Sequence, residues 1–162
     1  MHESAGSPEP RRDPSAPAPT ARLVPELKVA DFELSLAFYV ELAGFEVLYD
    51  RPETGFAYLD LGGAGLMIER DDGMWQTGEL DHPRGRGINF QIEVPDVAAL
   101  HRRFEAAAHP IVVPLEERWY RRGDDRVGQV QSLVQDPDGY LLRFADDLGT
   151  RRGPSPDDGP RP

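Results

Sequence analysis

The sequence predicts an α+β fold built from two βαβββ modules, whose curled mixed sheets surround a cavity. The main observation is a pattern that occurs twice along the 162 residues. Each copy has an alternating strand, an Asp that can cap a helix (Asp31 or Asp96), and further extended segments. A repeated unit that cannot bury its apolar face alone packs against another copy, and a cleft between two units is a common ligand site.

A second observation is the composition of the two ends of the chain. Residues 1–20 contain five prolines and residues 148–162 contain four, and neither segment has much apolar surface to offset the entropy of ordering. We therefore expect two disordered tails around a single domain over residues 21–147. The expected modules are residues 21–70 and 86–147, joined by a connector over residues 71–85.

The first module is expected to begin with a strand over residues 22–29, where Pro25 indicates an edge position or a bulge. Asp31 is a suitable N-cap for the helix that follows, and Gly44 is placed to end it. Apolar residues at helical spacing lie between them. Three short strands are expected over residues 45–51, 55–61 and 64–69.

The second module repeats this order. Residues 87–94 alternate cleanly and predict a strand, and Asp96 caps a helix that buries Val97, Leu100 and Phe104. The Asp-Pro-Asp-Gly run at 136–139 predicts a tight turn. Further strands are expected over residues 111–115, 127–135 and 139–144, with a charged loop over residues 116–126.

Strand alternation assigns one face of each sheet to its helix and leaves the other face for a site. In the strand over residues 55–61, for example, Ala57 and Leu59 are expected to pack on the helix while Phe56 and Tyr58 point away. The residues that point away are aromatic and polar, as in a small-molecule site. They include Phe56, Tyr58, Glu69, Asn89, Gln91, Gln131 and Arg143. A sheet surface that merely faces water is the open alternative.

Charge and composition narrow the class of partner. The net charge of −11, from 29 acidic and 18 basic residues, disfavours nucleic acid and is compatible with a cationic ligand. The absence of cysteine excludes disulfides and thiolate chemistry. No apolar stretch reaches membrane-spanning length or forms a signal core, so a cytoplasmic location is expected.

Three segments carry a resemblance to a known family. They are residues 27–39, residues 42–45 and residues 134–144, with the Ser-Leu-Ala-Phe-Tyr and Asp-Pro-Asp-Gly runs as the most specific parts. They resemble the vicinal-oxygen-chelate superfamily, also called the glyoxalase/bleomycin-resistance/dioxygenase fold. The resemblance implies paired βαβββ modules around a cavity and a homodimer. In the bleomycin-resistance branch the drug cavity lies at the dimer interface.

The resemblance also implies where a catalytic metal would be held. The corresponding positions are Val24 and Asn89 on the first strands, and Glu69 and Arg143 on the last strands. Val24 has no donor and Arg143 is a permanent cation, whereas a catalytic site needs about three good protein ligands. We therefore expect a cavity with no metal or other cofactor, in which Glu69 and Arg143 can face each other as an ion pair. The histidines do not supply the missing ligands and are expected on the surface: His2, His82, His101 and His109.

These observations predict a metal-free protein of the bleomycin-resistance type that sequesters an aromatic or cationic compound without turnover, so no catalytic residue is assigned. Trp119 joins the expected ligand contacts because the region before the last hairpin resembles the part of bleomycin-resistance proteins that stacks on the drug. A metal-dependent glyoxalase-type lyase, isomerase or dioxygenase is the alternative, because a one-residue shift changes every assignment. Its candidate ligands are Glu26, Glu69, Asn89, Gln91 and Glu93. A small-ligand sensor or accessory subunit is a third reading.

Overall fold

The computed structural model describes residues 21–153, and the chain falls into two compact halves, Met1–Asp81 and His82–Pro162. The tail predicted over residues 1–20 and the end of the second tail, residues 154–162, lie outside the described residues. Each half contains the βαβββ order and a four-stranded mixed sheet, which confirms the predicted fold class.

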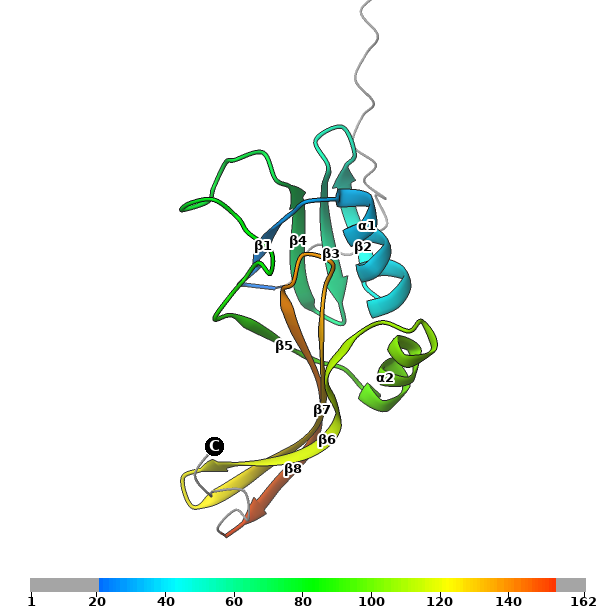
Figure 1. Cartoon of the computed structure of the whole chain (residues 1–162). Helices are drawn as coiled ribbons and strands as arrows, with labels where there is room; N and C mark the ends of the chain where they lie inside the picture. The colour runs from blue at the N-terminus through cyan, green and yellow to red at the C-terminus, as the bar shows by residue number, and fades with distance from the viewer. Residues whose placement is uncertain (1–20, 154–162) are drawn as a thin grey trace, which may run out of the picture. The chain divides into compact units, whose positions relative to one another are not determined.

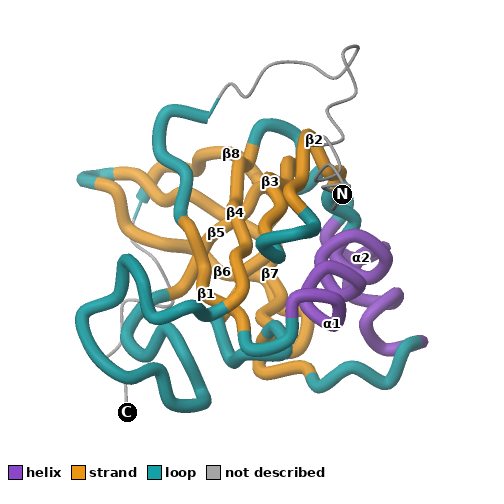
Figure 2. Tube along the Cα trace, turned by 90° about the horizontal axis from the view of Figure 1, so that it is seen from above, coloured by secondary structure: helices purple, strands orange, loops and turns teal. Residues whose placement is uncertain are grey.

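In the first half the sheet has the strand order β1-β4-β3-β2. Strand β1 runs parallel to β4, and the other pairs are antiparallel. As Pro25 indicated, β1 is an edge strand, and the Pro25 carbonyl accepts a hydrogen bond of 2.8 Å from the backbone N–H of Met67. The helix lies beside this sheet (Figures 1 and 2). The elements are β1 (Glu26–Val29), α1 (Phe32–Ala37), η1 (Phe38–Ala43), β2 (Glu46–Arg51), β3 (Phe56–Leu61) and β4 (Ala64–Arg70).

The first helix begins and ends where the sequence predicts. The Asp31 carboxylate accepts a hydrogen bond of 3.0 Å from the Leu34 N–H, and Gly44 ends the helix with φ of 88°, a conformation that favours glycine. The second part, η1, is a π-helix that the periodicity did not predict. Within it the fully buried Tyr39 ring packs edge-on against Phe45, with ring centres 5.5 Å apart.

In the second half the strand order is β5-β8-β7-β6, with β5 parallel to β8. The Asp96 carboxylate caps α2 by accepting from the Ala99 N–H at 2.8 Å, and the predicted apolar residues of this helix are buried. The predicted turn before β8 is also present, since the Gly139 N–H donates to the Asp136 carbonyl at 3.0 Å. The elements are β5 (Asn89–Glu93), α2 (Val97–Ala106), β6 (Ile111–Arg122), β7 (Asp125–Gln135) and β8 (Leu141–Arg152).

Two boundary predictions in this half are wrong. The charged segment 116–126 is not a loop, because it forms the ends of β6 and β7 around a turn at Gly123. Strand β8 continues to Arg152, so the domain does not end at residue 147 and the second tail does not begin at residue 148. The ends of β6, β7 and β8 pair with one another as a ribbon that carries many charged side chains. This part of the sequence lacks the apolar alternation that identifies a half-buried strand, so it does not read as strand from sequence alone.

None of the helices within residues 21–153 has the length and apolar character that crossing a membrane requires.

Candidate functional site

The aromatic residues of the first half form a stacked cluster on its sheet. The Tyr49 ring stacks on Phe56 and on Tyr58, with ring centres 5.8 and 5.4 Å apart, and Leu48 packs with them. This cluster contains the expected ligand contacts Phe56 and Tyr58, but their exposed fractions are only 2% and 4%. They therefore pack as an apolar cluster of their own rather than as an open aromatic wall.

Tyr58 also has an unusual polar environment. Burial, followed by the nearby Asp60 and Tyr49, raises the pKa of its phenol above the ordinary value. The hydroxyl is buried and has no hydrogen-bond partner among the described residues. Such a group costs stability while no partner reaches it.

Beside the aromatic cluster, one buried lysine holds three acidic side chains. Lys28 lies on β1 directly across from Glu69 on β4, and its ammonium donates to Glu69 at 2.5 Å and to Asp72 at 3.0 Å. Glu26 lies 3.8 Å from the same ammonium. Only 6% of the Lys28 side chain is exposed. We call these four residues the Lys28 cluster. Apart from the alternation of Glu26 and Lys28 on one strand, no sequence pattern predicts it.

The Lys28 cluster shifts the protonation of its members. Burial alone would lower the pKa of Lys28, but the hydrogen bonds that its ammonium donates to Glu69 and Asp72 outweigh burial, and the net shift is upward. Burial, then the hydrogen bond and charge of Glu69, raise the pKa of Glu26. The pKa of Asp72 is lowered first by the Met74 backbone N–H and then by Lys28. The lysine therefore stays charged, and Glu26 binds a proton more readily than an ordinary glutamate does.

The family-implied metal positions can now be compared with the structure. Glu69, the only acidic residue among them, is paired with Lys28 within its own half instead of being available to a cation. Arg143 carries a positive charge, and its buried Nε has no hydrogen-bond partner among the described residues. Nowhere in residues 21–153 do three or more His, Cys, Asp or Glu side chains form a group able to hold a metal ion. The residues present do not fit a divalent metal at these positions.

In the second half a chain of amide groups crosses the sheet. Gln91 donates to Gln129 at 3.3 Å, Gln129 donates to Gln131 at 2.6 Å, and Gln131 donates to Glu116 at 2.8 Å. The Tyr120 hydroxyl also donates to Gln131 at 3.1 Å. The structure thus connects two predicted site residues, Gln91 and Gln131, through Gln129, which the sequence analysis did not select.

The glutamate at the end of this chain is held ionised. Arg118 lies 2.9 Å from the Glu116 carboxylate. The hydrogen bond from Arg118, supported by one from Gln131, lowers the pKa of Glu116 despite its partial burial. The amide chain therefore ends in a fixed negative charge.

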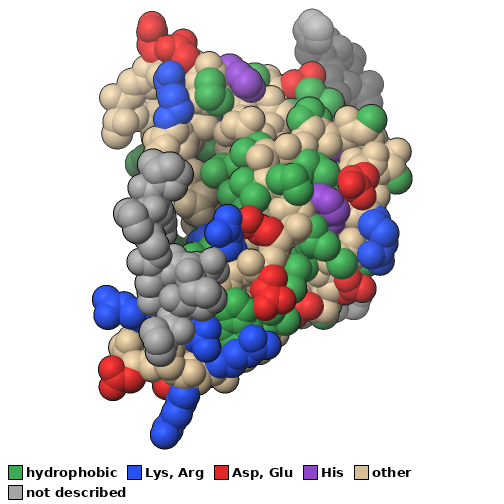
Figure 3. Space-filling model, turned by 60° about the horizontal axis from the view of Figure 1, so that its bottom comes forward, with side chains coloured by type: hydrophobic (Ala, Val, Ile, Leu, Met, Phe, Trp, Pro, Cys, Tyr) green, Lys and Arg blue, Asp and Glu red, His purple; other side chains and the backbone are tan. Residues whose placement is uncertain are grey.

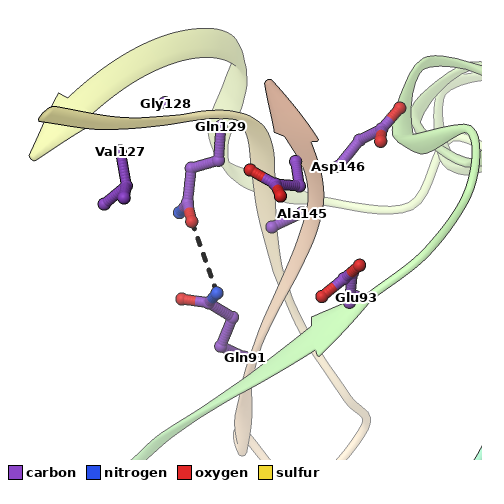
Figure 4. A pocket seen from close by; sticks show the side chains of 8 residues that line it. Gln91, Glu93, Val127, Gly128, Gln129, Ala145 and Asp146 are labelled. Atoms are coloured by element: carbon purple, nitrogen blue, oxygen red, sulfur yellow. Dashed lines mark hydrogen bonds between the residues drawn. The ribbon is translucent and has the colours of Figure 1, made fainter. Parts of the chain in front are cut away.

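A small pocket of about 100 Å³ opens beside Gln91 (Figure 4). Gln91 and Gln129 point toward one another across it, and the carboxylates of Glu93 and Asp146 lie nearby (Figure 4). Three of the lining residues are acidic, which suits a cationic group better than an anion. Asn89 and Arg143 do not line this pocket. The lining residues are Gln91, Glu93, Val127, Gly128, Gln129, Ala145, Asp146 and Asp147.

Trp119 lies on β6 and not in a loop. Its exposed fraction is 7%, its ring Nε1 donates to Glu117 at 2.6 Å, and the Arg151 guanidinium lies 3.9 Å from the ring centre. The ring also fills the space where Gly128 lacks a side chain, since a Cβ there would lie 2.6 Å from the indole. The face that was expected to stack on a ligand is therefore covered by an arginine of the same sheet.

Two histidine predictions need correction. His82 is exposed as expected, and His2 lies outside the described residues. His101, however, is buried, with Nδ1 at 2.9 Å from the Ser132 hydroxyl, and His109 Nε2 lies 2.7 Å from the Gln135 carbonyl. His101 is enclosed on α2, whereas His109 follows the end of this helix and is half-buried. Apolar spacing alone does not show which polar side chains are buried in this way.

His101 belongs to a Glu-His-Ser arrangement that is structural. Glu105 lies 3.5 Å from His101 Nε2, so the order of groups is that of a nucleophilic triad. Ser132, however, is only 2% exposed and donates its hydroxyl proton to the Val113 carbonyl at 3.2 Å. An enclosed hydroxyl that already donates to the backbone cannot reach a substrate, so these residues connect α2 to β6 and β7.

Comparison with known proteins gives a consistent result. A model of the "Glyoxalase/Bleomycin resistance protein/Dioxygenase superfamily" matches residues 22–144. A lactoylglutathione lyase of Pseudomonas putida is 30% identical over 145 residues, which cover 72% of this chain and 79% of that protein. The crystal structure of TioX from Micromonospora sp. ML1 is 28% identical with a TM-score of 0.61, covering 78% of this chain and 98% of that one. A lactoylglutathione lyase structure from Agrobacterium tumefaciens, at 20% identity and a TM-score of 0.53, covers 79% of this chain and 94% of that one and supports the fold alone.

Proposed function

Because the chain belongs to the glyoxalase/bleomycin resistance protein/dioxygenase superfamily, we propose that it is a metal-free binding protein of the bleomycin-resistance type. It sequesters a small aromatic or cationic compound without turnover. The observation that carries this proposal is the ion pair of Lys28 with Glu69. A buried ammonium occupies the one carboxylate that could serve as a metal ligand at the family-implied positions, and it repels any divalent cation that approaches.

The remaining polar groups suit recognition better than reaction. The Tyr58 hydroxyl and the Arg143 Nε are buried hydrogen-bond donors without partners among the described residues, and each can be satisfied by an acceptor atom of a ligand. The acidic pocket beside Gln91 provides complementary charge for a cationic group. The triad-like set of Ser132, His101 and Glu105 does not offer an activated nucleophile, since its serine is enclosed and donates to the backbone.

The proposal is tested by metal analysis and by ligand binding on the full chain. We expect purified protein to contain less than about 0.1 equivalent of zinc, iron, manganese or nickel, and a cationic compound with a flat heteroaromatic part, such as bleomycin, to raise the melting temperature. Gln91→Ala should weaken that stabilisation, whereas Arg102→Gln on the exposed face of α2 is the matched control. One equivalent of tightly bound metal, or no stabilisation at millimolar drug, contradicts the proposal.

A homodimer is part of the same proposal, because the family resemblance implies a ligand cavity completed by two copies. Sedimentation equilibrium at micromolar concentration should give twice the monomer mass of 18.0 kDa. A monomer at concentrations at which the ligand binds would remove the dimer from the proposal.

The alternative function is a metal-dependent lyase, and the 30% identity to a lactoylglutathione lyase favours it. In that case the Lys28–Glu69 pair would have to open to release a carboxylate. A lactoylglutathione lyase assay with added zinc or nickel separates the two functions. Turnover that disappears in Glu69→Gln and is unaffected by Arg102→Gln would support the lyase and exclude a protein that only binds.

A further inference from the structure

The outer part of the second sheet carries three arginines in one row. Arg121 on β6 is directly opposite Arg126 on β7, and Arg126 is directly opposite Arg151 on β8. Residues directly opposite one another in antiparallel strands point to the same face, and neighbouring strands are about 4.8 Å apart. We call these three residues the arginine row. It places three positive charges side by side on one face.

The neighbouring row shows what a purely structural arrangement looks like. There Asp125 lies between Arg122 and Arg152, so that the charges alternate across the strands. Arg122 also donates to the Thr150 hydroxyl at 3.1 Å. Like charges directly opposite one another destabilise a sheet, and opposite charges stabilise it. The arginine row places like charges opposite one another, which is unfavourable, whereas the neighbouring row of the same strands alternates positive and negative charges.

The guanidinium groups of the row are supported from below by Trp119. Arg151 lies 3.9 Å and Arg126 lies 5.9 Å from the centre of the indole ring. The indole face therefore attracts both positive charges, most closely that of Arg151, and Arg121 and Arg151 are exposed to solvent. The Arg126 Nε is buried and has no hydrogen-bond partner among the described residues. No carboxylate in residues 21–153 forms an ion pair with any of the three.

We propose that the arginine row is a binding site for an oligophosphate group, meaning two or more linked phosphates on a small molecule. Arginine pairs with phosphate through two parallel hydrogen bonds, and three such forks at strand spacing suit several anionic oxygens in a line. The site is distinct from the amide chain, because Trp119 and the row alternate with Arg118 and Tyr120 along β6 and so face the other side of the sheet.

The negative charge of the rest of the chain favours a compact anion over an extended polyanion such as a nucleic acid. The chain has a net charge of −11, whereas the row holds three arginines; on the same face of β6 the nearest carboxylate along the strand, Glu117, accepts a hydrogen bond of 2.6 Å from the Trp119 indole. Figure 3 shows several Lys and Arg side chains in the lower left of the view and others at the top left, in the centre and at the right edge, among acidic side chains. A nucleic acid would extend beyond the screening length of about 10 Å into acidic surroundings, whereas a compact oligophosphate interacts with the row alone.

The test uses the full chain carrying Trp75→Phe, so that Trp119 is the only tryptophan. Sodium tripolyphosphate is titrated at low ionic strength, with Trp119 fluorescence and calorimetry as readouts. We expect saturable binding that Arg121→Gln, Arg126→Gln or Arg151→Gln each weakens by about tenfold. Arg102→Gln on α2, which makes the same charge change away from the row, should alter the affinity by less than about twofold.

Arg121→Gln keeps the test independent of folding, because Arg121 is exposed and is not one of the two arginines stacked on Trp119. Its melting temperature should match that of the parent. The proposal is wrong if neither readout changes with 10 mM tripolyphosphate, or if Arg102→Gln weakens binding as much as Arg121→Gln. Equally tight binding of citrate overturns the assignment to phosphate. Salt-sensitive self-association that the row variants abolish would instead assign the row to a second copy of the chain.

Discussion

Replacing Lys28 by methionine tests whether the Lys28 cluster is held by its single positive charge. Methionine has a similar length and keeps the packing of the stem, so the variant removes mainly the ammonium group. Glu69 then loses its 2.5 Å partner and Asp72 its 3.0 Å partner. Glu26 and Glu69 are left close together with no cation between them.

The expected loss of stability follows from burial. Removing one member of a buried ion pair costs about 3–5 kcal/mol, because the partner charge stays in a poorly solvated place. The Lys28 side chain is 6% exposed and that of Glu69 is 17% exposed, whereas Asp72 is 47% exposed and can be solvated. We therefore expect the lower end, about 3 kcal/mol at pH 8, equivalent to a fall in melting temperature of about 6–12 °C for a chain of this size.

The pH dependence of the loss identifies its cause. The raised pKa of Lys28 means that its contribution is complete below the unfolded value of about 10.4 and is lost as pH rises through the native value. The deficit of Lys28→Met should therefore shrink in strong alkali. It should also shrink toward pH 4.5, because the pKa of Glu26 is raised and a proton on Glu26 removes the repulsion.

Urea unfolding followed by circular dichroism at pH 4.5, at pH 8 and at a pH above the raised native pKa of Lys28 measures these differences. The double variant Lys28→Met/Glu69→Gln removes both charges and should recover at least half of the loss. Arg86→Met, which removes an exposed charge, should change stability by less than about 0.5 kcal/mol. A Lys28→Met protein as stable as the parent at pH 8, or a deficit independent of pH, would refute the electrostatic reasoning.

Three further predictions concern the second half. Gly128→Val should cost about 2–3 kcal/mol, because a Cβ at this position lies 2.6 Å from the Trp119 indole. The displaced Trp119 should become exposed, which is seen as a red shift of its fluorescence. The control Gly78→Val, where a Cβ has no atom within 4 Å, should be nearly neutral; equal losses in the two variants would contradict the packing of Trp119 on Gly128. Asp136→Ala should cost about 2–3 kcal/mol in urea unfolding, since its carboxylate accepts from the backbone N–H groups of Asp138 at 3.0 Å and Tyr140 at 2.8 Å; an unchanged midpoint would show that these bonds do not matter. Ser132→Ala should cost about 1–2 kcal/mol and increase amide exchange in α2, because His101 loses its buried partner; unchanged exchange would argue against the connection.

The sequence allowed prediction of the βαβββ order because its signals are local. Asp31, Gly44 and Asp96 each act within a few residues, and their hydrogen bonds or dihedral angles are those expected. The outer ribbon was missed because its order does not come from apolar alternation. There Gly128 admits the Trp119 ring, and arginines stack on that ring, so the strand is stabilised by contacts between β6, β7 and β8. Such contacts have no periodic signal along one strand.

The site residues were predicted by type and face, but exposure depends on neighbours that alternation does not identify. Phe56 and Tyr58 lie on one face as expected, yet Leu48 and Tyr49 pack over them from the next strand, where the register shifts between Val47 and Tyr49. One extra residue in β2 therefore changes which side chains meet those of β3. No feature of the sequence alone predicts that shift.

The partner of Glu69 shows the same limit in electrostatic terms. The expected pairing with Arg143 was chosen because both residues stood at family-implied positions, but the register of β1 on β4 places Lys28 directly beside Glu69. A cation on the adjacent strand is held at hydrogen-bond distance by the sheet itself, so it needs no further ordering of side chains to pair. Lys28 is the only lysine in the chain. If its role were merely to fill space, any long side chain would serve, and the recovery expected in Lys28→Met/Glu69→Gln would not occur.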